Sequence, residues 1–190
     1  MSLHNLDEPY QSAYKTHNIT ETALLRVKDD VLKAMDKSHV VFLVLLDLSA
    51  AFDTIDHDLL LKRMNTELGI SGIALQWFKS YLSDRQSRVS IGNNYSDPVD
   101  LEYGLPQGSI LGPLKFLIYT LPLDKIIRRH ALDFHLYADD TQLYCSFDPK
   151  IPGARQHAIE KLQLCIAEIQ EWMTSNKIKL NESKTEFIVL

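Results

Sequence analysis

Val40-Val-Phe-Leu-Val-Leu-Leu-Asp47 decides how the rest of this sequence is interpreted, because an unbroken apolar run ends directly in a carboxylate. β-Branched and aromatic side chains favour strands, and a continuous apolar run of this length is typical of a strand covered on both faces. We therefore predict a buried strand over Val40–Leu46, with Asp47 at its end.

Further carboxylates lie in a turn between two other predicted strands. Residues 132–137 alternate as a half-buried strand does, residues 143–147 can pair with them, and Ala138-Asp139-Asp140 connects the two. Neighbouring strands lie about 4.8 Å apart, so Asp47, Asp139 and Asp140 would converge if these strands share a sheet. Two simpler interpretations remain open, because Asp-Asp is ordinary turn chemistry and Asp47 can cap a following helical turn.

Helical spacing and turn residues account for most of the remaining chain. A first helix is predicted after Thr20, its N-cap, and ends near residues 36–38, with Leu24, Val27, Val31 and Met35 on its inner face. Further helices are predicted around residues 59–67, 73–82, 109–121 and 154–175, with N-caps at Asp56 and Ser71 for the first two of these. Residues 85–102, around Gly92-Asn93-Asn94, are predicted to form a hairpin, and residues 177–190 a strand, a turn and a second strand. These elements indicate an α+β fold, with the acids on one side of a small antiparallel sheet and helix 154–175 on the other.

The composition is that of an ordinary globular domain and excludes several classes of protein. The 190 residues include 20 basic and 25 acidic side chains, so a net charge of −5 gives no general attraction to nucleic acid. Two cysteines, Cys145 and Cys165, do not make a disulfide framework or a zinc finger. No apolar run reaches the roughly 18 to 20 residues that span a bilayer, so we expect an intracellular protein with no membrane partner.

Basic side chains in two parts of the sequence are expected to make local phosphate contacts. They are Lys62, Arg63, Lys79, Arg85, Arg88, Lys125, Arg128 and Arg129.

Converging carboxylates indicate a particular kind of metal site. Carboxylates repel one another, so without a cation they would raise a pKa or destabilise the fold. Oxygen ligands without His or thiolate favour Mg²⁺, or Mn²⁺, over zinc or copper. Two such ions about 3.5 to 4 Å apart suit in-line phosphoryl transfer, which suggests nucleotidyl transfer.

Four motifs in a fixed order carry a family resemblance. They are Val41-Phe-Leu-Val-Leu-Leu-Asp47-Leu-Ser-Ala-Ala-Phe52-Asp, Gly104-Leu-Pro-Gln-Gly-Ser-Ile-Leu-Gly-Pro113, Tyr137-Ala-Asp-Asp140 and Asn181-x-x-Lys184-Thr. Together they resemble the reverse transcriptase palm of LINE-type, non-LTR, jockey-like retrotransposon polymerases, over nearly the whole chain. The resemblance implies one truncated domain over residues 1–190, with a palm and partial fingers and without a thumb. It also implies RNA-directed DNA synthesis, with an RNA template, a DNA primer and dNTPs as partners and two Mg²⁺ ions, or Mn²⁺, as cofactors.

The resemblance also implies roles for residues that match the motifs. Asp47, Asp139 and Asp140 would hold the metals together with the carbonyl of Leu48, and Lys184 would protonate the leaving pyrophosphate. Ala50 and Ala51 would contact the triphosphate, and Phe52 would exclude a ribose 2′-OH. Gln107 and Gly108 would pack against the incoming nucleotide and template, and Tyr137 would lie beside the primer end.

Two other functional interpretations are considered. The first is an inert or domesticated retroelement remnant that acts at most as an RNA-binding module, which the truncation and the acidic charge favour. The second is another two-metal palm enzyme, such as a nucleotide cyclase. The Pro-Gln-Gly loop and the Tyr-Ala-Asp-Asp turn argue against a cyclase.

Overall fold

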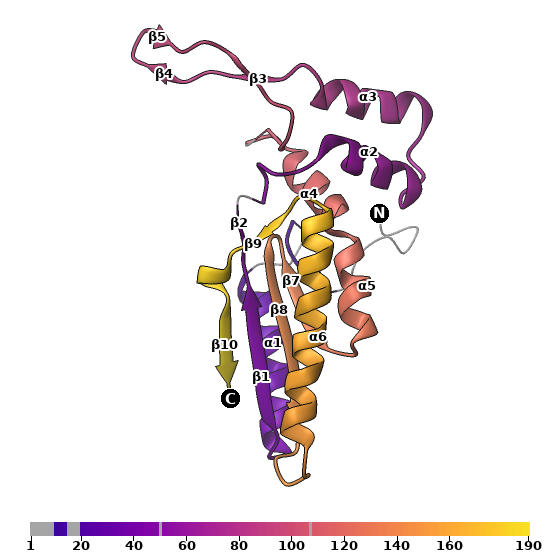
Figure 1. The fold of residues 1–190 in the computed structure, drawn as a ribbon, viewed down its shortest axis with the longest axis vertical. Coiled ribbons are helices and arrows are strands. Elements are labelled where there is room, and N and C mark those ends of the chain that lie inside the picture. Colours follow the sequence, from indigo (N-terminus) through magenta and orange to yellow (C-terminus); the bar gives the residue numbers. More distant parts are fainter. Residues whose placement is uncertain (1–9, 15–19, 50, 107) are drawn as a thin grey trace. The chain divides into compact units, whose positions relative to one another are not determined.

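The strand predicted over Val40–Leu46 forms with those bounds and becomes β1, an inner strand of a four-stranded antiparallel sheet (Figure 1). The computed structural model describes residues 10–14, 20–49, 51–106 and 108–190. The order of the sheet is β10 (Glu186–Val189), β1, β8 (Asp140–Phe147), β7 (Asp133–Tyr137). The predicted antiparallel sheet is therefore confirmed, and it brings β1 directly beside the hairpin that carries the second group of acids.

Helices cover both faces of this sheet. Helix α1 (Thr20–Asp36) packs Val27 and Val31 against Val41 and Tyr144, on the face that also carries Leu43. Figure 1 shows α6 (Ala154–Ser175) on the opposite face of the sheet, and α5 (Pro122–Arg129) lies against α6 and β7. The helix predicted over residues 154–175 is confirmed, and it covers one face of the sheet (Figure 1).

The chain divides into two compact units. The first consists of Met1–Ala51 and Thr120–Leu190 and contains the sheet; the second is Phe52–Tyr119. Within the first unit, β2 (Leu48–Ser49) pairs with β9 (Lys179–Leu180), and the 3-10 helix η2 (Glu182–Lys184) connects β9 to β10. This pairing brings the segment after Asp47 beside the segment before Lys184.

The second unit contains two helices, a long hairpin and a buried helix. Asp56 caps α2 (His57–Thr66), since its carboxylate accepts a hydrogen bond from the Leu59 amide at 2.9 Å. Ser71 takes the N-cap position of α3 (Gly72–Leu82) without a side-chain hydrogen bond. The hairpin pairs β3 (Gln86–Ser87) with β6 (Val99–Asp100) and β4 (Ser90–Ile91) with β5 (Asn94–Tyr95), and α4 (Gly112–Thr120) follows. All these elements were predicted.

The burial predicted from the sequence pattern is wrong for two elements, α1 and β7. Leu24 and Met35 of α1 are exposed rather than packed inside, and Ala23 is buried instead, because α1 packs on the sheet through a different part of its surface, with Val27 and Val31 against Val41 and Tyr144. Strand β7 is not half-buried, since Phe134, His135 and Leu136 are all less than 9% exposed. Both faces of β7 are covered because it contacts α1 as well as α5.

Candidate active site

The strand register places two of the predicted acids opposite each other. The last pair between β1 and β8 is Leu46 with Thr141, so continuing the register by one residue brings Asp47 opposite Asp140. Asp139 lies at the tip of the hairpin, because Tyr137 pairs with Asp140 and only two residues form the turn. The acids therefore gather where β1 ends and the β7–β8 turn begins, as predicted from the sequence.

Residues near the C-terminal strand hold Asp47 in place. The Asn181 side-chain amide donates a hydrogen bond to Asp47 Oδ2 at 3.1 Å, and its backbone amide donates to the Asp47 carbonyl oxygen at 2.8 Å. The Lys184 ammonium lies 3.5 Å from the same Oδ2. The lysine side chain is 68% exposed and the aspartate 23% exposed, so this ion pair is partly screened by water.

A cavity of about 390 Å³ opens beside these residues. Asp47 and Asp140 line it together with Gln142, Lys184 and Glu186. Burial raises the pKa of Asp140, and the negative charges of Asp139 and Asp47 raise it further, while Lys184 opposes this shift. Three carboxylates are thus close enough to repel one another at the edge of a water-accessible cavity.

The same carboxylates fit a divalent cation by their chemistry. They provide oxygen ligands only, and a cation would relieve the repulsion that raises the pKa of Asp140. Within the described ranges, no three His, Cys, Asp or Glu side chains converge into a preformed metal cage. An open site of this kind is what Mg²⁺ uses when water and substrate phosphates complete its coordination.

Other predicted residues of the first unit lie close to the acids or outside the described ranges. Leu48 follows Asp47 directly in β2 and is buried, and Ala51 is also buried. Tyr137 ends β7 and is half-buried beside the turn. Ala50 and Gln107 lie outside the described residues.

In the second unit, Phe52 is held by aromatic packing. Its ring stacks on Phe116 of α4, with ring centres 4.9 Å apart, and its carbonyl oxygen accepts a hydrogen bond from the Leu105 amide at 2.7 Å. Gly108 has a φ of +76°, which favours glycine, and a Cβ there would meet no protein atom within 4 Å. The space beside Gly108 is therefore open on the protein's side.

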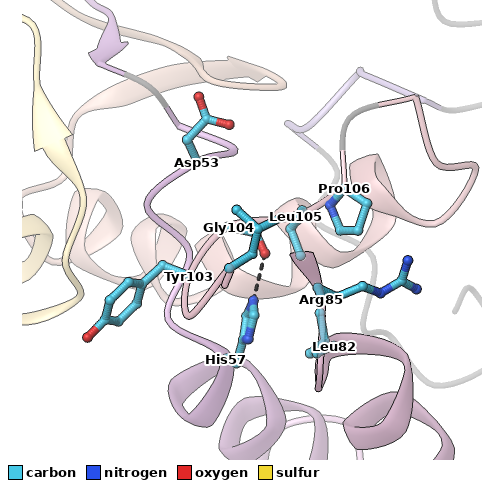
Figure 2. A pocket seen from close by; sticks show the side chains of 9 residues that line it. Asp53, His57, Leu82, Arg85, Tyr103, Gly104, Leu105 and Pro106 are labelled. Carbon is cyan, nitrogen blue, oxygen red and sulfur yellow. Dashed lines mark hydrogen bonds between the residues drawn. The ribbon is translucent and has the colours of Figure 1, made fainter. Parts of the chain in front are cut away.

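The start of the Gly104–Pro113 motif is fixed to the segment that follows Phe52. His57 Nε2 lies 2.7 Å from the Gly104 carbonyl oxygen, beside a small cavity of about 190 Å³. Figure 2 marks this hydrogen bond with a dashed line. The Gly104 amide also donates to the Ile55 carbonyl at 2.8 Å, and a Cβ on Gly104 would lie 2.9 Å from the Asp53 carbonyl oxygen. Only glycine fits this approach, so the segment 52–57 and the motif form one packed piece.

Comparisons with known proteins agree with this geometry. The sequence profile of the family described as reverse transcriptase (RNA-dependent DNA polymerase) matches residues 1–189. The chain belongs to the reverse transcriptase family. The resemblance to jockey-like, LINE-type elements is thereby confirmed, together with the reverse transcriptase palm fold.

Curated relatives of this reverse transcriptase domain come from mobile elements. It is 29% identical to a probable RNA-directed DNA polymerase from transposon BS of Drosophila melanogaster, over 93% of this chain and 19% of that protein. It is 28% identical to the RNA-directed DNA polymerase from mobile element jockey of Drosophila funebris, over 92% of this chain and 19% of that protein. The chain therefore spans about a fifth of the length of these relatives.

Solved structures share the fold of the reverse transcriptase domain at lower sequence identity. Apo telomerase from Candida tropicalis, truncated from its C-terminal domain, superposes with a TM-score of 0.66 at 16% identity, over 94% of this chain and 36% of that one. Telomerase from Candida albicans, in complex with a fragment of telomeric RNA, gives a TM-score of 0.61 at 13% identity, over 93% and 31% of the two chains. Among the described residues, no helix has the length and apolarity to cross a membrane.

Several arginines proposed for phosphate contacts hold parts of the reverse transcriptase domain together. Arg63 donates to the Tyr119 carbonyl oxygen and lies over the Tyr119 ring. Arg85 donates to the Tyr81 carbonyl oxygen at 2.8 Å. Arg129 pairs with Glu168, and this arginine and His130 lower the pKa of Glu168 through their hydrogen bonds. Within the described part of the chain, these arginines therefore make intramolecular contacts that stabilise the fold.

Three residues with defined positions in the structure were not predicted from the sequence. Asn181 belongs to the Asn181-x-x-Lys184-Thr motif, but the sequence indicates no role for it, and it indicates none for Gln11. Lys115 is buried in α4 with its ammonium 3.4 Å from the centre of the Tyr81 ring. A charged residue within an apolar helix was the available signal for Lys115, while no local pattern shows where a glutamine far upstream will bind.

Proposed function

We propose that this chain contributes the catalytic palm of a non-LTR retrotransposon RNA-directed DNA polymerase, which extends the 3′-OH of a DNA primer with dNTPs on an RNA template. The observation that carries the proposal is the convergence of Asp47, Asp139 and Asp140 at the ends of β1 and β7, where burial and then the charges of the other two acids raise the pKa of Asp140. Family membership supports this choice among enzymes with converging acids.

Asp47, Asp139 and Asp140, with the Leu48 carbonyl, would hold two Mg²⁺ ions, and Mn²⁺ can substitute. Bound divalent ions supply a lowered pKa for the attacking hydroxyl and charge stabilisation for the leaving pyrophosphate. The protein's own contribution is to fix the carboxylates in advance. Asn181 does so for Asp47 through two hydrogen bonds, which restrict both its backbone and its side chain.

Lys184 is the proposed proton donor to pyrophosphate. Its side chain is 68% exposed and its ammonium lies 3.5 Å from Asp47 Oδ2, so the ammonium is free to rotate away when a phosphate group competes for it. In the ion pair, Lys184 also offsets the negative charge that Asp47 adds beside Asp140.

Phe52 is the residue proposed to select the sugar of the nucleotide. The aromatic ring would exclude a ribose 2′-OH, and its stacking on Phe116 gives it a fixed orientation. Ala50 and Ala51 would contact the triphosphate, Gln107 and Gly108 the nucleotide and template, and Tyr137 the primer end. The open space beside Gly108 supports close approach of a ligand there.

We further propose that residues 1–190 form a palm with part of the fingers of a longer polymerase. Relatives about five times longer support this arrangement, since the chain covers 19% of each. The RNA template and DNA primer are proposed partners because the relatives are described as RNA-directed DNA polymerases.

Manganese binding tests the proposed site directly. Titration of the protein with Mn²⁺, followed by electron paramagnetic resonance of the free ion, is expected to show binding that Asp139→Asn weakens at least tenfold. Asp97→Asn is the matched control, because Asp97 lies on the exposed hairpin of the second unit. Equal Mn²⁺ affinity for the wild type, Asp139→Asn and Asp97→Asn would overturn the assignment.

A further inference from the structure

We propose that Gln11 is a positioning residue for Asp139, because its side-chain oxygen ties the Ala138-Asp139 turn to the edge of the sheet. The side-chain oxygen Oε1 accepts a hydrogen bond from the Ala138 amide at 3.1 Å. This inference deepens the proposed function and rests on it for the role of Asp139 as a metal ligand. The hydrogen bond itself is a property of the fold and is testable without metal.

The Gln11 side chain is itself fixed. It is 6% exposed, and the same Oε1 also accepts a hydrogen bond from the Ala13 amide at 2.8 Å. One buried acceptor thus joins two backbone donors that lie 125 positions apart in the sequence, at residues 13 and 138. Since a buried amide without a partner is costly, both donors favour the observed rotamer of Gln11.

The backbone around Gln11 extends the sheet beyond β7. Gln11 forms a parallel bridge with Leu136; the Ser12 amide donates to the Leu136 carbonyl at 3.0 Å, and the Leu136 amide donates to the Tyr10 carbonyl at 2.8 Å. These bonds satisfy both backbone groups of Leu136 on the outer side of β7. They fix the register of this segment against β7, so that Gln11 lies beside Leu136, two residues before Ala138.

Side-chain packing anchors the same segment. The Tyr10 ring packs on Phe134 of β7 with ring centres 5.0 Å apart. The Arg26 and Arg128 guanidinium groups lie 4.8 Å and 5.0 Å from the centre of the Tyr10 ring, which fits two cation-π contacts. Gln11 is therefore attached to a fixed segment rather than to a loose one.

The turn that Gln11 contacts needs external support. Ala138 has a φ of +55°, a left-handed conformation that non-glycine residues adopt only when their surroundings hold them there. Ala138 directly precedes Asp139, so a change in the Ala138 backbone changes the direction of the Asp139 side chain. By accepting a hydrogen bond from the Ala138 amide, Gln11 stabilises this turn conformation. The conformation in turn sets the direction of the Asp139 side chain, which is the proposed metal ligand.

The chemistry of the contact allows a matched pair of variants. Only the oxygen of the Gln11 amide is needed, so Gln11→Glu keeps an acceptor of the same length, whereas Gln11→Met keeps the length and removes the acceptor. The control variant is Gln156→Met, because Gln156 is exposed on α6, where its side-chain amide donates a hydrogen bond to Glu160 at 2.9 Å.

The test measures amide hydrogen exchange and N–H residual dipolar couplings of Ala138 and Asp139 in the full 190-residue chain. We expect Gln11→Met to speed exchange of the Ala138 amide at least tenfold and to change the couplings of both residues. Gln11→Glu is expected to restore both, and Gln156→Met to change neither. Rapid Ala138 exchange in the wild type, or unchanged exchange in Gln11→Met, would overturn the proposal; the wild-type measurement decides even if the Met variant does not fold.

Mn²⁺ titration of the same variants separates this inference from the proposed function. We expect Gln11→Met to weaken Mn²⁺ binding at least threefold and Gln11→Glu to recover it. If exchange at Ala138 responds while Mn²⁺ affinity stays the same, the hydrogen bond exists but the positioning role is wrong. If the wild type binds no Mn²⁺, the proposed function fails, while the exchange data and couplings still judge the contact between Gln11 and the turn.

Discussion

Asn181 binds Asp47 twice, through its side-chain amide to Oδ2 at 3.1 Å and through its backbone amide to the carbonyl oxygen at 2.8 Å, although 134 positions separate the two residues. The first bond holds the carboxylate and the second holds the backbone from which it extends. Asn181 can bind both because β9 pairs with β2, immediately after Asp47. Asn181, near the C-terminus, thus fixes the position of Asp47, which directly follows β1.

Replacement of Asn181 is expected to weaken the acidic site. Asn181→Ala removes the side-chain hydrogen bond to Asp47, at a cost of about 1 kcal/mol in the free energy of unfolding. Asn181→Asp places a further negative charge beside Asp47, so it should destabilise the protein more than Ala at pH 7 and less at pH 3, where carboxylates are protonated. Urea unfolding at both pH values checks this order, and the same ranking of the two variants at both pH values would contradict it.

Lys115 makes the stability of the protein depend on pH in the alkaline range. Burial, with a smaller contribution from Arg85, lowers its pKa from 10.5 to about 8, and its ammonium has no hydrogen-bond partner in the described structure. Between these two values the unfolded chain binds a proton that the folded protein has lost, so stability rises with pH through this window. Lys115→Met should remove that rise and stabilise the protein at pH 7 by about 1 kcal/mol or more.

Unfolding by urea at pH 7 and pH 9.5 measures this effect. Lys79→Met is the control, since Lys79 is an exposed lysine of the same unit. The account of Lys115 is wrong if the wild type and Lys115→Met change in stability by the same amount between the two pH values.

Gly104 and Gly92 offer a matched test of close packing. Both have positive φ, +88° and +61°, but a Cβ on Gly104 would lie 2.9 Å from the Asp53 carbonyl oxygen, whereas one on Gly92 would meet nothing within 4 Å. Gly92→Ala should therefore cost only the backbone strain of about 1 kcal/mol. Gly104→Ala should cost at least about 2 kcal/mol, because backbone must move as well. Equal melting temperatures for the two variants would show that the segment 52–57 does not pack on Gly104 as described.

Phe52 provides a test of nucleotide selection. Phe52→Val removes the ring that is proposed to exclude the 2′-OH, so incorporation of ribonucleotides relative to deoxynucleotides should rise at least tenfold. Phe52→Tyr keeps the aromatic ring that stacks on Phe116 and should retain selection. Single-nucleotide extension with each substrate gives the ratio. An unchanged ratio in Phe52→Val would leave Phe52 as a packing residue only.

The main elements of this fold are readable from sequence because their patterns are local. The run Val40–Leu46 and the helix Ala154–Ser175 form with the bounds expected from apolarity and spacing. Burial was harder to predict, since it depends on partners far along the chain. Leu24 is exposed because α1 covers only part of one face of the sheet, and His135 is buried because β7 contacts two helices.

The acids of the site were predictable, but the residues that support them were not. Asp47, Asp139 and Asp140 end strands with clear signals, so their convergence followed from strand pairing alone. Gln11 and Asn181 act through hydrogen bonds to backbone and side-chain atoms more than 120 positions away. The periodicity of the sequence does not predict such contacts, because they depend on how segments far apart in the chain pack along the edges of the sheet.

Primer extension on an RNA template tests the central claim most directly. The purified chain is incubated with a DNA primer, dNTPs and Mg²⁺ or Mn²⁺, beside Asp139→Asn and the exposed control Asp97→Asn. We predict template-dependent extension by the wild type and Asp97→Asn, with at least a hundredfold loss in Asp139→Asn. Equal extension by the wild type and Asp139→Asn would contradict the proposal that this chain contributes the catalytic palm.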